Sequence, residues 1–102
     1  MEITKNNFDE EVLNAEGLVL VDFYADWCAP CMMLKQSLVE IEEFHKIKIC
    51  KINVDNEPEL AIKFGVSSIP HVLFYKDGKK VDSFLGYRPT PEIETIIEEI
   101  GE

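Results

Sequence analysis

Residues 18–31 have the sequence LVLVDFYADWCAPC. The first part, Leu18 to Tyr24, is an almost unbroken apolar run, which predicts a strand that is covered on both faces of a sheet. The segment that follows, Cys31 to His45, has apolar residues at helical spacing and glutamates between them, which predicts an amphipathic helix. The cysteine pair Cys28 and Cys31 is therefore expected at a strand-to-helix junction.

The alternation of strands and helices continues along the chain. Runs of β-branched residues predict strands, and periodic apolar residues between capping signals predict helices. The other expected elements are an extended start at Glu2–Thr4, a helix through Asn14 capped by Asn6 or Asn7, a strand Ile47–Val54, a helix Pro58–Phe64, strands His71–Tyr75 and Val81–Leu85 joined by an Asp77-Gly78 turn, and a helix capped by Thr90 that runs to Ile100. This order predicts one α/β domain over residues 1–102, with helices on both faces of the sheet.

The composition restricts the classes of partner. The chain has 102 residues, of which 46% are hydrophobic and 29% charged, as in an ordinary globular domain. Its formal net charge of −10 repels phosphate backbones and anionic lipid, so neither nucleic acid nor a membrane surface is an expected partner. The longest apolar run, Leu18–Val21, is far too short to span a bilayer, and no export signal opens the chain. We expect a monomer in the cytoplasm.

The position of the cysteine pair indicates its chemistry. At the N-terminus of a helix, free N–H groups and the positive end of the helix dipole favour a thiolate. The pKa of Cys28 is therefore expected below that of free cysteine, and Cys28 is the predicted nucleophile. Cys31 follows three residues later on the same helical face, which makes it the predicted resolving thiol.

A structural disulfide and a metal site are weaker interpretations of the pair. A disulfide that closes a ring of about four residues gives only ~2 kcal/mol by loop-closure entropy, so it would stabilise the fold little. A closed metal site needs four ligands, and Cys50, His45 and His71 would have to converge on the pair, since the chain has no second CxxC. We predict redox chemistry with no metal, and Cys50 as a small buried hydrophobe.

Two charged residues fall on strand faces that are expected to be buried. Side chains alternate between the faces of a strand, so Asp22 shares a face with Leu20, and Lys51 shares one with Ile49. A buried carboxylate is costly, so Asp22 should have a raised pKa or a balancing cation, for which Lys51 is the candidate. The alternatives are a backbone cap that satisfies Asp22 and a Lys51 side chain whose ammonium extends into water.

Taken together, four segments resemble the thioredoxin family: VDFYADWCAPC at 21–31, KINVD at 51–55, SIPH at 68–71 and KDG at 76–78. The resemblance covers essentially the whole chain. It implies the thioredoxin fold, a mixed five-stranded sheet flanked by four helices, and a thiol-disulfide oxidoreductase that reduces protein disulfides. The implied partners are substrate proteins with disulfides and a thioredoxin reductase or equivalent electron donor. No cofactor is implied beyond the Cys28–Cys31 disulfide.

The resemblance also assigns residue roles. Asp22 is expected to act with the catalytic cysteines by accepting the proton of Cys31, while Lys51 is assigned beside it from strand alternation alone. A cis peptide bond is implied before Pro70, opposite the disulfide. An exposed apolar rim around Cys28 is expected to bind substrate through Trp27, Ala29, Pro30, Ile69, Pro70 and Gly86. For Trp27 the alternative is a core aromatic.

Ala29 and Pro30 are expected to tune the reduction potential, and Ala29 stands where thioredoxins usually carry glycine. Ala-Pro lacks the histidine that stabilises the reduced form in oxidising relatives, which favours a reductase. His71 follows Pro70 where threonine is frequent, and an ordinary hydrogen-bonded role is expected for it. The alternative functions are an isomerase or glutaredoxin-like variant, and a redox-independent binding module that uses the groove around Trp27 and Pro70.

Overall fold

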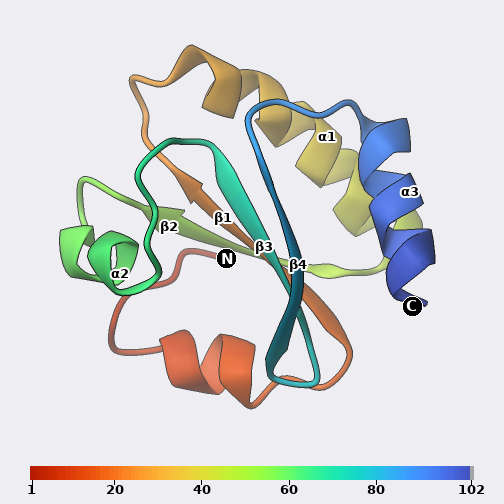
Figure 1. The fold of residues 1–102 in the computed structure, drawn as a ribbon, viewed down its shortest axis with the longest axis horizontal. Coiled ribbons are helices and arrows are strands. Elements are labelled where there is room, and N and C mark those ends of the chain that lie inside the picture. Colours follow the sequence, from red (N-terminus) through yellow and green to blue (C-terminus); the bar gives the residue numbers. More distant parts are fainter. Residues whose placement is uncertain (102) are drawn as a thin grey trace.

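The computed structural model describes residues 1–101, in which four strands form one mixed sheet in the order β2-β1-β3-β4 (Figure 1). The strands are β1 (Leu18–Tyr24), β2 (Lys48–Asn53), β3 (His71–Lys76) and β4 (Lys79–Leu85). β1 runs parallel to β2 and antiparallel to β3, and β4 runs antiparallel to β3. Because β1 has a strand on each side and a covered surface on both faces, all of its residues are buried.

Helices cover the two faces of the sheet. α1 (Ala29–His45) and α3 (Thr90–Ile100) lie on one face, while α2 (Pro58–Lys63) and a short π-helix, η1 (Asp9–Leu13), lie on the other (Figure 1). Two apolar clusters fill the layers between them. The cluster under α1 and α3 includes Leu20, Leu34, Ile41, Phe74 and Ile93, and the cluster under α2 and η1 includes Val12, Val21, Phe23, Leu60 and Leu73. No helix within residues 1–101 combines the length and apolar character needed to cross a membrane.

The expected fifth strand is wrong. Near the N-terminus the chain forms only one isolated bridge, between Glu2 and Lys51 of β2. The N–H of Ile3 donates to the carbonyl of Lys51, and the N–H of Lys51 donates to the carbonyl of Met1, both at 2.8 Å. The pairing ends there because the chain turns at Thr4, whose N–H donates to the side chain of Asn7 at 2.7 Å.

Capping was predicted less well than element order. Asn7 closes the turn at Thr4 instead of capping a helix. Thr90 is the first residue of α3, and its hydroxyl donates to Glu40 of α1, so it joins two helices and does not cap its own. The hairpin turn between β3 and β4 has the predicted positive φ angles at Asp77 and Gly78, 51° and 83°.

Candidate active site

Cys28 and Cys31 lie where β1 passes into α1 and are joined by a disulfide, with their Cα atoms 5.2 Å apart. Cys28 has an extended backbone (φ −92°, ψ 107°) and is the N-cap of α1. Its Sγ accepts a hydrogen bond from the N–H of Cys31 at 3.2 Å. The helix starts at Ala29, two residues before the predicted start, because this sulfur satisfies an N–H group that would otherwise have no partner.

Segments far apart in the sequence meet at the disulfide. The cysteines pack with Tyr24, Ala25, Val54 and Ile69, and Cys28 and Cys31 are only 5% and 1% exposed. Cys28 Sγ lies 3.9 Å from the carbonyl oxygen of Ile69. The Ile69–Pro70 peptide bond is cis, as the resemblance implies. The disulfide therefore faces the backbone that leads into β3.

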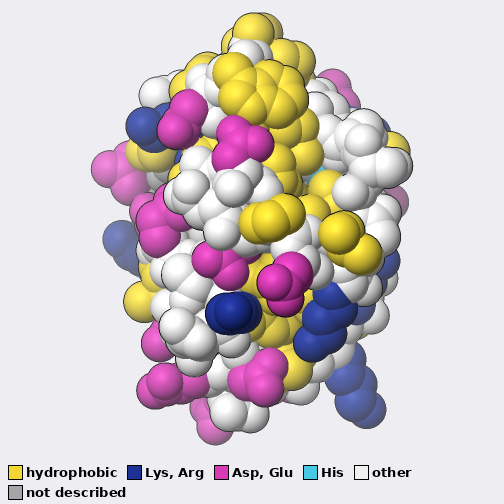
Figure 2. Space-filling view, turned by 90° about the vertical axis from the view of Figure 1, so that its left-hand side faces the viewer, with side chains coloured by type: hydrophobic (Ala, Val, Ile, Leu, Met, Phe, Trp, Pro, Cys, Tyr) yellow, Lys and Arg dark blue, Asp and Glu magenta, His cyan; other side chains and the backbone are white. Residues whose placement is uncertain are grey.

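The surface around Cys28 is mostly apolar, and Trp27 is its most exposed member. Trp27 is 71% exposed, which excludes the core alternative, and its indole N–H donates to Asp55 at 2.8 Å. A groove of about 220 Å³ lies beside it, lined by Trp27, Val54, Ala61, Val66, Ser67, Ser68 and Ile69. Figure 2 shows apolar side chains gathered at the end of the molecule where β1 leads into α1, with carboxylates next to them.

Other members of the expected rim differ in exposure. Ala29 and Pro30 are exposed, while Ile69 and Gly86 are half-buried. Pro70 is buried, so the expectation that it is exposed is wrong. Its carbonyl accepts a hydrogen bond from the N–H of Gly86 at 2.8 Å, which ties it to the chain that leaves β4.

Asp22 is a buried carboxylic acid without a hydrogen-bond partner. It is 1% exposed, and neither of its carboxyl oxygens is hydrogen-bonded within the described residues, so the expected alternative of a backbone cap is wrong. Burial raises the pKa of Asp22 to about 7. The Lys51 ammonium opposes this rise, and the Glu2 carboxylate adds to it. The group can therefore gain or lose a proton near neutral pH.

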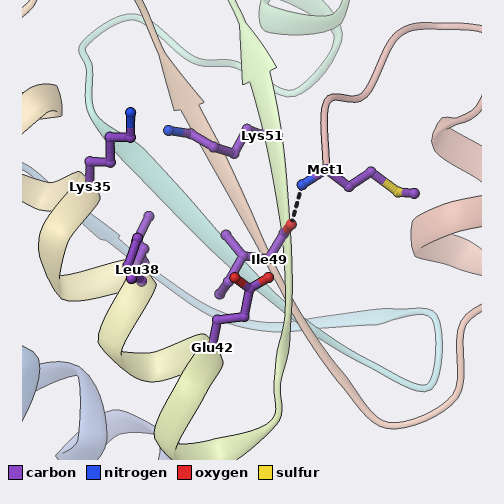
Figure 3. A pocket seen from close by; sticks show the side chains of 7 residues that line it. Met1, Lys35, Leu38, Glu42, Ile49 and Lys51 are labelled. Atoms are coloured by element: carbon purple, nitrogen blue, oxygen red, sulfur yellow. Dashed lines mark hydrogen bonds between the residues drawn. The ribbon is translucent and has the colours of Figure 1, made fainter.

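Lys51 lies on β2 directly opposite Asp22 in the register of the two strands. Its Nζ is 4.0 Å from Oδ2 of Asp22, and the side chain is 20% exposed. The ammonium is therefore directed at Asp22 and not only at water. Lys51 also lines a cavity of about 90 Å³ between α1 and β2 (Figure 3).

Comparison with known proteins identifies the family. The thioredoxin family model matches residues 1–99. The chain belongs to the thioredoxin family. Thioredoxin of Listeria monocytogenes is 47% identical over 98 residues, which cover 94% of this chain and 93% of that protein. Thioredoxin 1 of Nostoc sp. is 38% identical over 99 residues, covering 95% and 92%, and chloroplastic thioredoxin M5 of Oryza sativa is 43% identical over 96 residues, covering 92% and 56%.

Family membership and the paired cysteines together give the activity. The thioredoxin-family chain is a thiol-disulfide oxidoreductase, and its redox-active group is the Cys28–Cys31 disulfide. Thioredoxins need no cofactor beyond such a disulfide. Within residues 1–101, no group of three or more His, Cys, Asp or Glu side chains is arranged to hold a metal ion.

The remaining candidate ligands of this thioredoxin-family protein have separate surroundings. Cys50 is unpaired and fully buried, as predicted. His45 Nε2 lies 2.7 Å from Glu94. His71 Nδ1 is buried without a hydrogen-bond partner in the described part of the chain, so the expected hydrogen-bonded role is not found for that atom.

Sequence reasoning missed three residues near the site. The Tyr24 hydroxyl donates a hydrogen bond to Glu2 at 2.7 Å, and its ring lies under Lys51. Strand alternation could have found Tyr24, since it follows Asp22 by two residues and therefore shares its face. No sequence pattern indicated that Glu2 lies near the site, because its position depends on the bridge to β2. Asp55 lies in one of the segments that resemble thioredoxins, but its hydrogen bond with Trp27 could not be read from the sequence.

Proposed function

We propose that this protein reduces disulfide bonds in other proteins, with Cys28 as the nucleophile and Cys31 as the resolving thiol. One observation carries the assignment. The Cys28 sulfur is the N-cap of α1 and accepts the N–H of Cys31. Because the same N–H and the helix dipole stabilise negative charge on that sulfur, Cys28 is the better thiolate of the two.

In the first step, the Cys28 thiolate attacks one sulfur of a substrate disulfide. The substrate S–S bond breaks, a Cys28–substrate disulfide forms, and the other substrate sulfur leaves as a thiolate that takes a proton from water. The exposed Trp27 and the groove beside it offer apolar contact to the substrate chain. The Ile69 backbone, next to Cys28 Sγ, offers hydrogen-bonding groups to an extended substrate.

In the second step, Cys31 attacks Cys28 Sγ, and the second substrate sulfur leaves. The products are a substrate dithiol and the Cys28–Cys31 disulfide, so two electrons pass from the protein to the substrate. Cys31 must first lose its proton, and the ionised carboxylate of Asp22 is the proposed acceptor. A pKa of about 7 suits this role, because an effective base has a pKa near the working pH. Lys51 assists by favouring the ionised form of Asp22.

Electrons must return to the disulfide from a separate protein, for which we propose a thioredoxin reductase or an equivalent donor. The proposed compartment is the cytoplasm, since Cys28–Cys31 must be reduced to act and a reducing environment keeps such pairs as thiols. Ala29 and Pro30 are proposed to set the potential, because they form the exposed first turn between the two sulfurs.

The equilibrium of the Cys28–Cys31 couple with glutathione tests the direction of the reaction. We expect a potential of about −270 mV, as in thioredoxins, which is low enough to reduce protein disulfides. A potential above about −200 mV would overturn the reductase proposal in favour of an oxidase or isomerase. Cys28→Ser tests the redox role itself. If the biological role survives in that variant, the protein is instead a binding module.

A further inference from the structure

A small network surrounds Lys51, whose ammonium lies beside Asp22. Lys51 Nζ lies 4.0 Å from Asp22 and also 4.4 Å from the centroid of the Tyr24 ring. The Tyr24 hydroxyl donates a hydrogen bond to Oε2 of Glu2 at 2.7 Å. Contacts therefore run without a break from the N-terminal segment, through an aromatic ring and an ammonium group, to the buried carboxylate.

The backbone places all four residues on the α1 side of the sheet. Asp22 and Tyr24 are two positions apart on β1, so their side chains share a face. Lys51 pairs with Asp22 across the two strands, and Glu2 bridges to Lys51 on its other side. Since the N–H and the carbonyl of Lys51 are hydrogen-bonded to Met1 and Ile3 of the N-terminal segment, its backbone is fixed and only its side chain needs to be held.

The Lys51 side chain could also extend into the neighbouring cavity, away from Asp22. It lines the cavity between α1 and β2 together with Lys35, Leu38, Val39, Glu42 and Ile49. Figure 3 shows the Lys51 and Lys35 side chains at one end of this cavity, with the Glu42 carboxylate further along α1. Glu42 and water are therefore competing partners for the ammonium. The face of an aromatic ring attracts a cation, so the Tyr24 ring favours the position next to Asp22.

We propose that Tyr24 and Glu2 are positioning residues that keep the Lys51 ammonium beside Asp22 and so set the pH at which Asp22 accepts the proton of Cys31. The inference rests on the proposed role of Asp22. Tyr24 supplies the ring face, and Glu2 fixes the ring by accepting a hydrogen bond from its hydroxyl. Burial and the bond to Glu2 raise the pKa of Tyr24, so that hydroxyl remains a donor.

The two residues act on Asp22 with opposite signs. Lys51 lowers the pKa of Asp22, so loss of the Tyr24 ring, which lets the ammonium move away, should raise it. The Glu2 carboxylate raises the pKa of Asp22 directly, so neutralising Glu2 should lower it. On the elements packed against this face, Lys35 of α1 lines the same cavity as Lys51, and the β3 residue paired with Asp22 is the uncharged Val72.

The test is the titration of the Asp22 carboxyl carbon by NMR in the reduced protein. For Tyr24→Leu we expect the midpoint to rise by roughly half a pH unit, the size that a cation–ring contact supports. For Glu2→Gln, which can still accept the tyrosine hydroxyl, we expect the midpoint to fall. Tyr24→Phe keeps the ring and should stay closer to wild type than Tyr24→Leu. Glu98→Gln, on the exposed side of α3, controls for the loss of one negative charge.

A midpoint in Tyr24→Leu that is unchanged or lower would overturn the proposal, because simple loss of packing would admit water and stabilise the carboxylate. Should that variant not fold, incorporation of pentafluorophenylalanine at position 24 replaces it, since this residue has the shape of phenylalanine but lacks the negative ring face. Its midpoint should lie above that of Tyr24→Phe, and equal midpoints would again reject the proposal.

Failure of the proposed function would look different. The decay of the Cys28–substrate disulfide, followed by rapid quench, reports whether Asp22 assists Cys31. If Asp22→Asn decays as fast as wild type at pH 7, Asp22 is not the acceptor and that step of the proposed function is wrong. The NMR midpoints of the variants at position 24 would still decide, independently, whether Tyr24 holds Lys51 beside Asp22.

Discussion

The N-terminus of α1 and the middle of β2 both contain buried cysteine sulfur, yet their surroundings are opposite in kind. Cys28 and Cys50 are 5% and 0% exposed. The Cys28 sulfur caps a helix and accepts a backbone N–H, whereas Cys50 lies in an apolar cluster with Val21 and Ile52. Burial raises the pKa of the Cys50 thiol. Exposure alone therefore does not separate a reactive cysteine from an inert one, and the donors that face the sulfur do.

The largest effect is expected for Cys28→Ser. A hydroxyl at the helix N-terminus cannot form the mixed disulfide, so the rate of substrate disulfide reduction should fall to the rate without protein. Insulin reduction with dithiothreitol as electron donor measures this. Cys50→Ser is the matched control and should keep the activity of the folded protein. Equal losses in the two variants would contradict the distinction between the two sulfur sites.

Cys31→Ser should separate the two steps. Cys28 can still attack, but no resolving thiol follows, so a Cys28–substrate disulfide should accumulate stoichiometrically and catalytic turnover should stop. Mass spectrometry of the acid-quenched protein detects the trapped species. If the adduct forms instead on Cys50, the assignment of Cys28 as the nucleophile is wrong.

Asp22→Ala should change stability in a pH-dependent way. The pKa of Asp22 in the folded protein, about 7, lies above its ordinary value of 3.8, so the folded state binds the proton more tightly than the unfolded state. Wild type therefore loses stability as the pH rises from about 4 to about 7, by on the order of 4 kcal/mol as an upper bound, and stays at the lower level above pH 7.

The Asp22→Ala variant has no carboxyl group at this position, so it does not lose stability between about pH 4 and pH 7 for this reason. Urea denaturation should find Asp22→Ala more stable than wild type by about 2–4 kcal/mol at pH 8, with the gain absent at pH 4. The same variant should resolve mixed disulfides more slowly at pH 8. A stability difference that does not change between the two pH values would mean that folding does not raise the pKa of Asp22.

The smallest effect is expected for Cys50→Ala. Loss of one buried sulfur should cost about 1 kcal/mol of stability and leave disulfide reduction unchanged. In the folded wild-type protein, iodoacetamide should label reduced Cys28 rapidly and Cys50 only on the timescale of unfolding. Labelling of Cys50 at a comparable rate would show that β2 opens locally.

The parts of the fold that follow from short-range pattern were predictable. The apolar run Leu18–Tyr24 is β1, and the Asp77-Gly78 turn joins β3 and β4 as the dipeptide indicates. Strand parity predicted that Asp22 is buried near Lys51, and both proved correct. The expected strand at Glu2–Thr4 failed, because whether a segment pairs beyond one bridge depends on where the chain turns, which Thr4 and Asn7 decide.

Contacts between segments that are distant in the chain could not be predicted from the sequence. Periodicity does not report that Tyr24 meets Glu2, since this contact depends on the bridge between the N-terminal segment and β2. The burial of Pro70 was equally hidden, because it follows from the hydrogen bond between Pro70 and Gly86 at the end of β4. The residues of the site that follow from local pattern were thus predictable, and the contacts that join distant segments around it were not.

The exposed Trp27 gives the molecule a built-in optical signal. It is the only tryptophan of the chain, it adjoins Cys28, and its indole is held by Asp55. A disulfide accepts electrons from an excited indole, whereas a dithiol does so far less well, so emission at this single fluorophore should brighten on reduction. Turnover of the unlabelled protein could then be followed in real time. A substrate that covers the indole should shift the wavelength of its emission maximum.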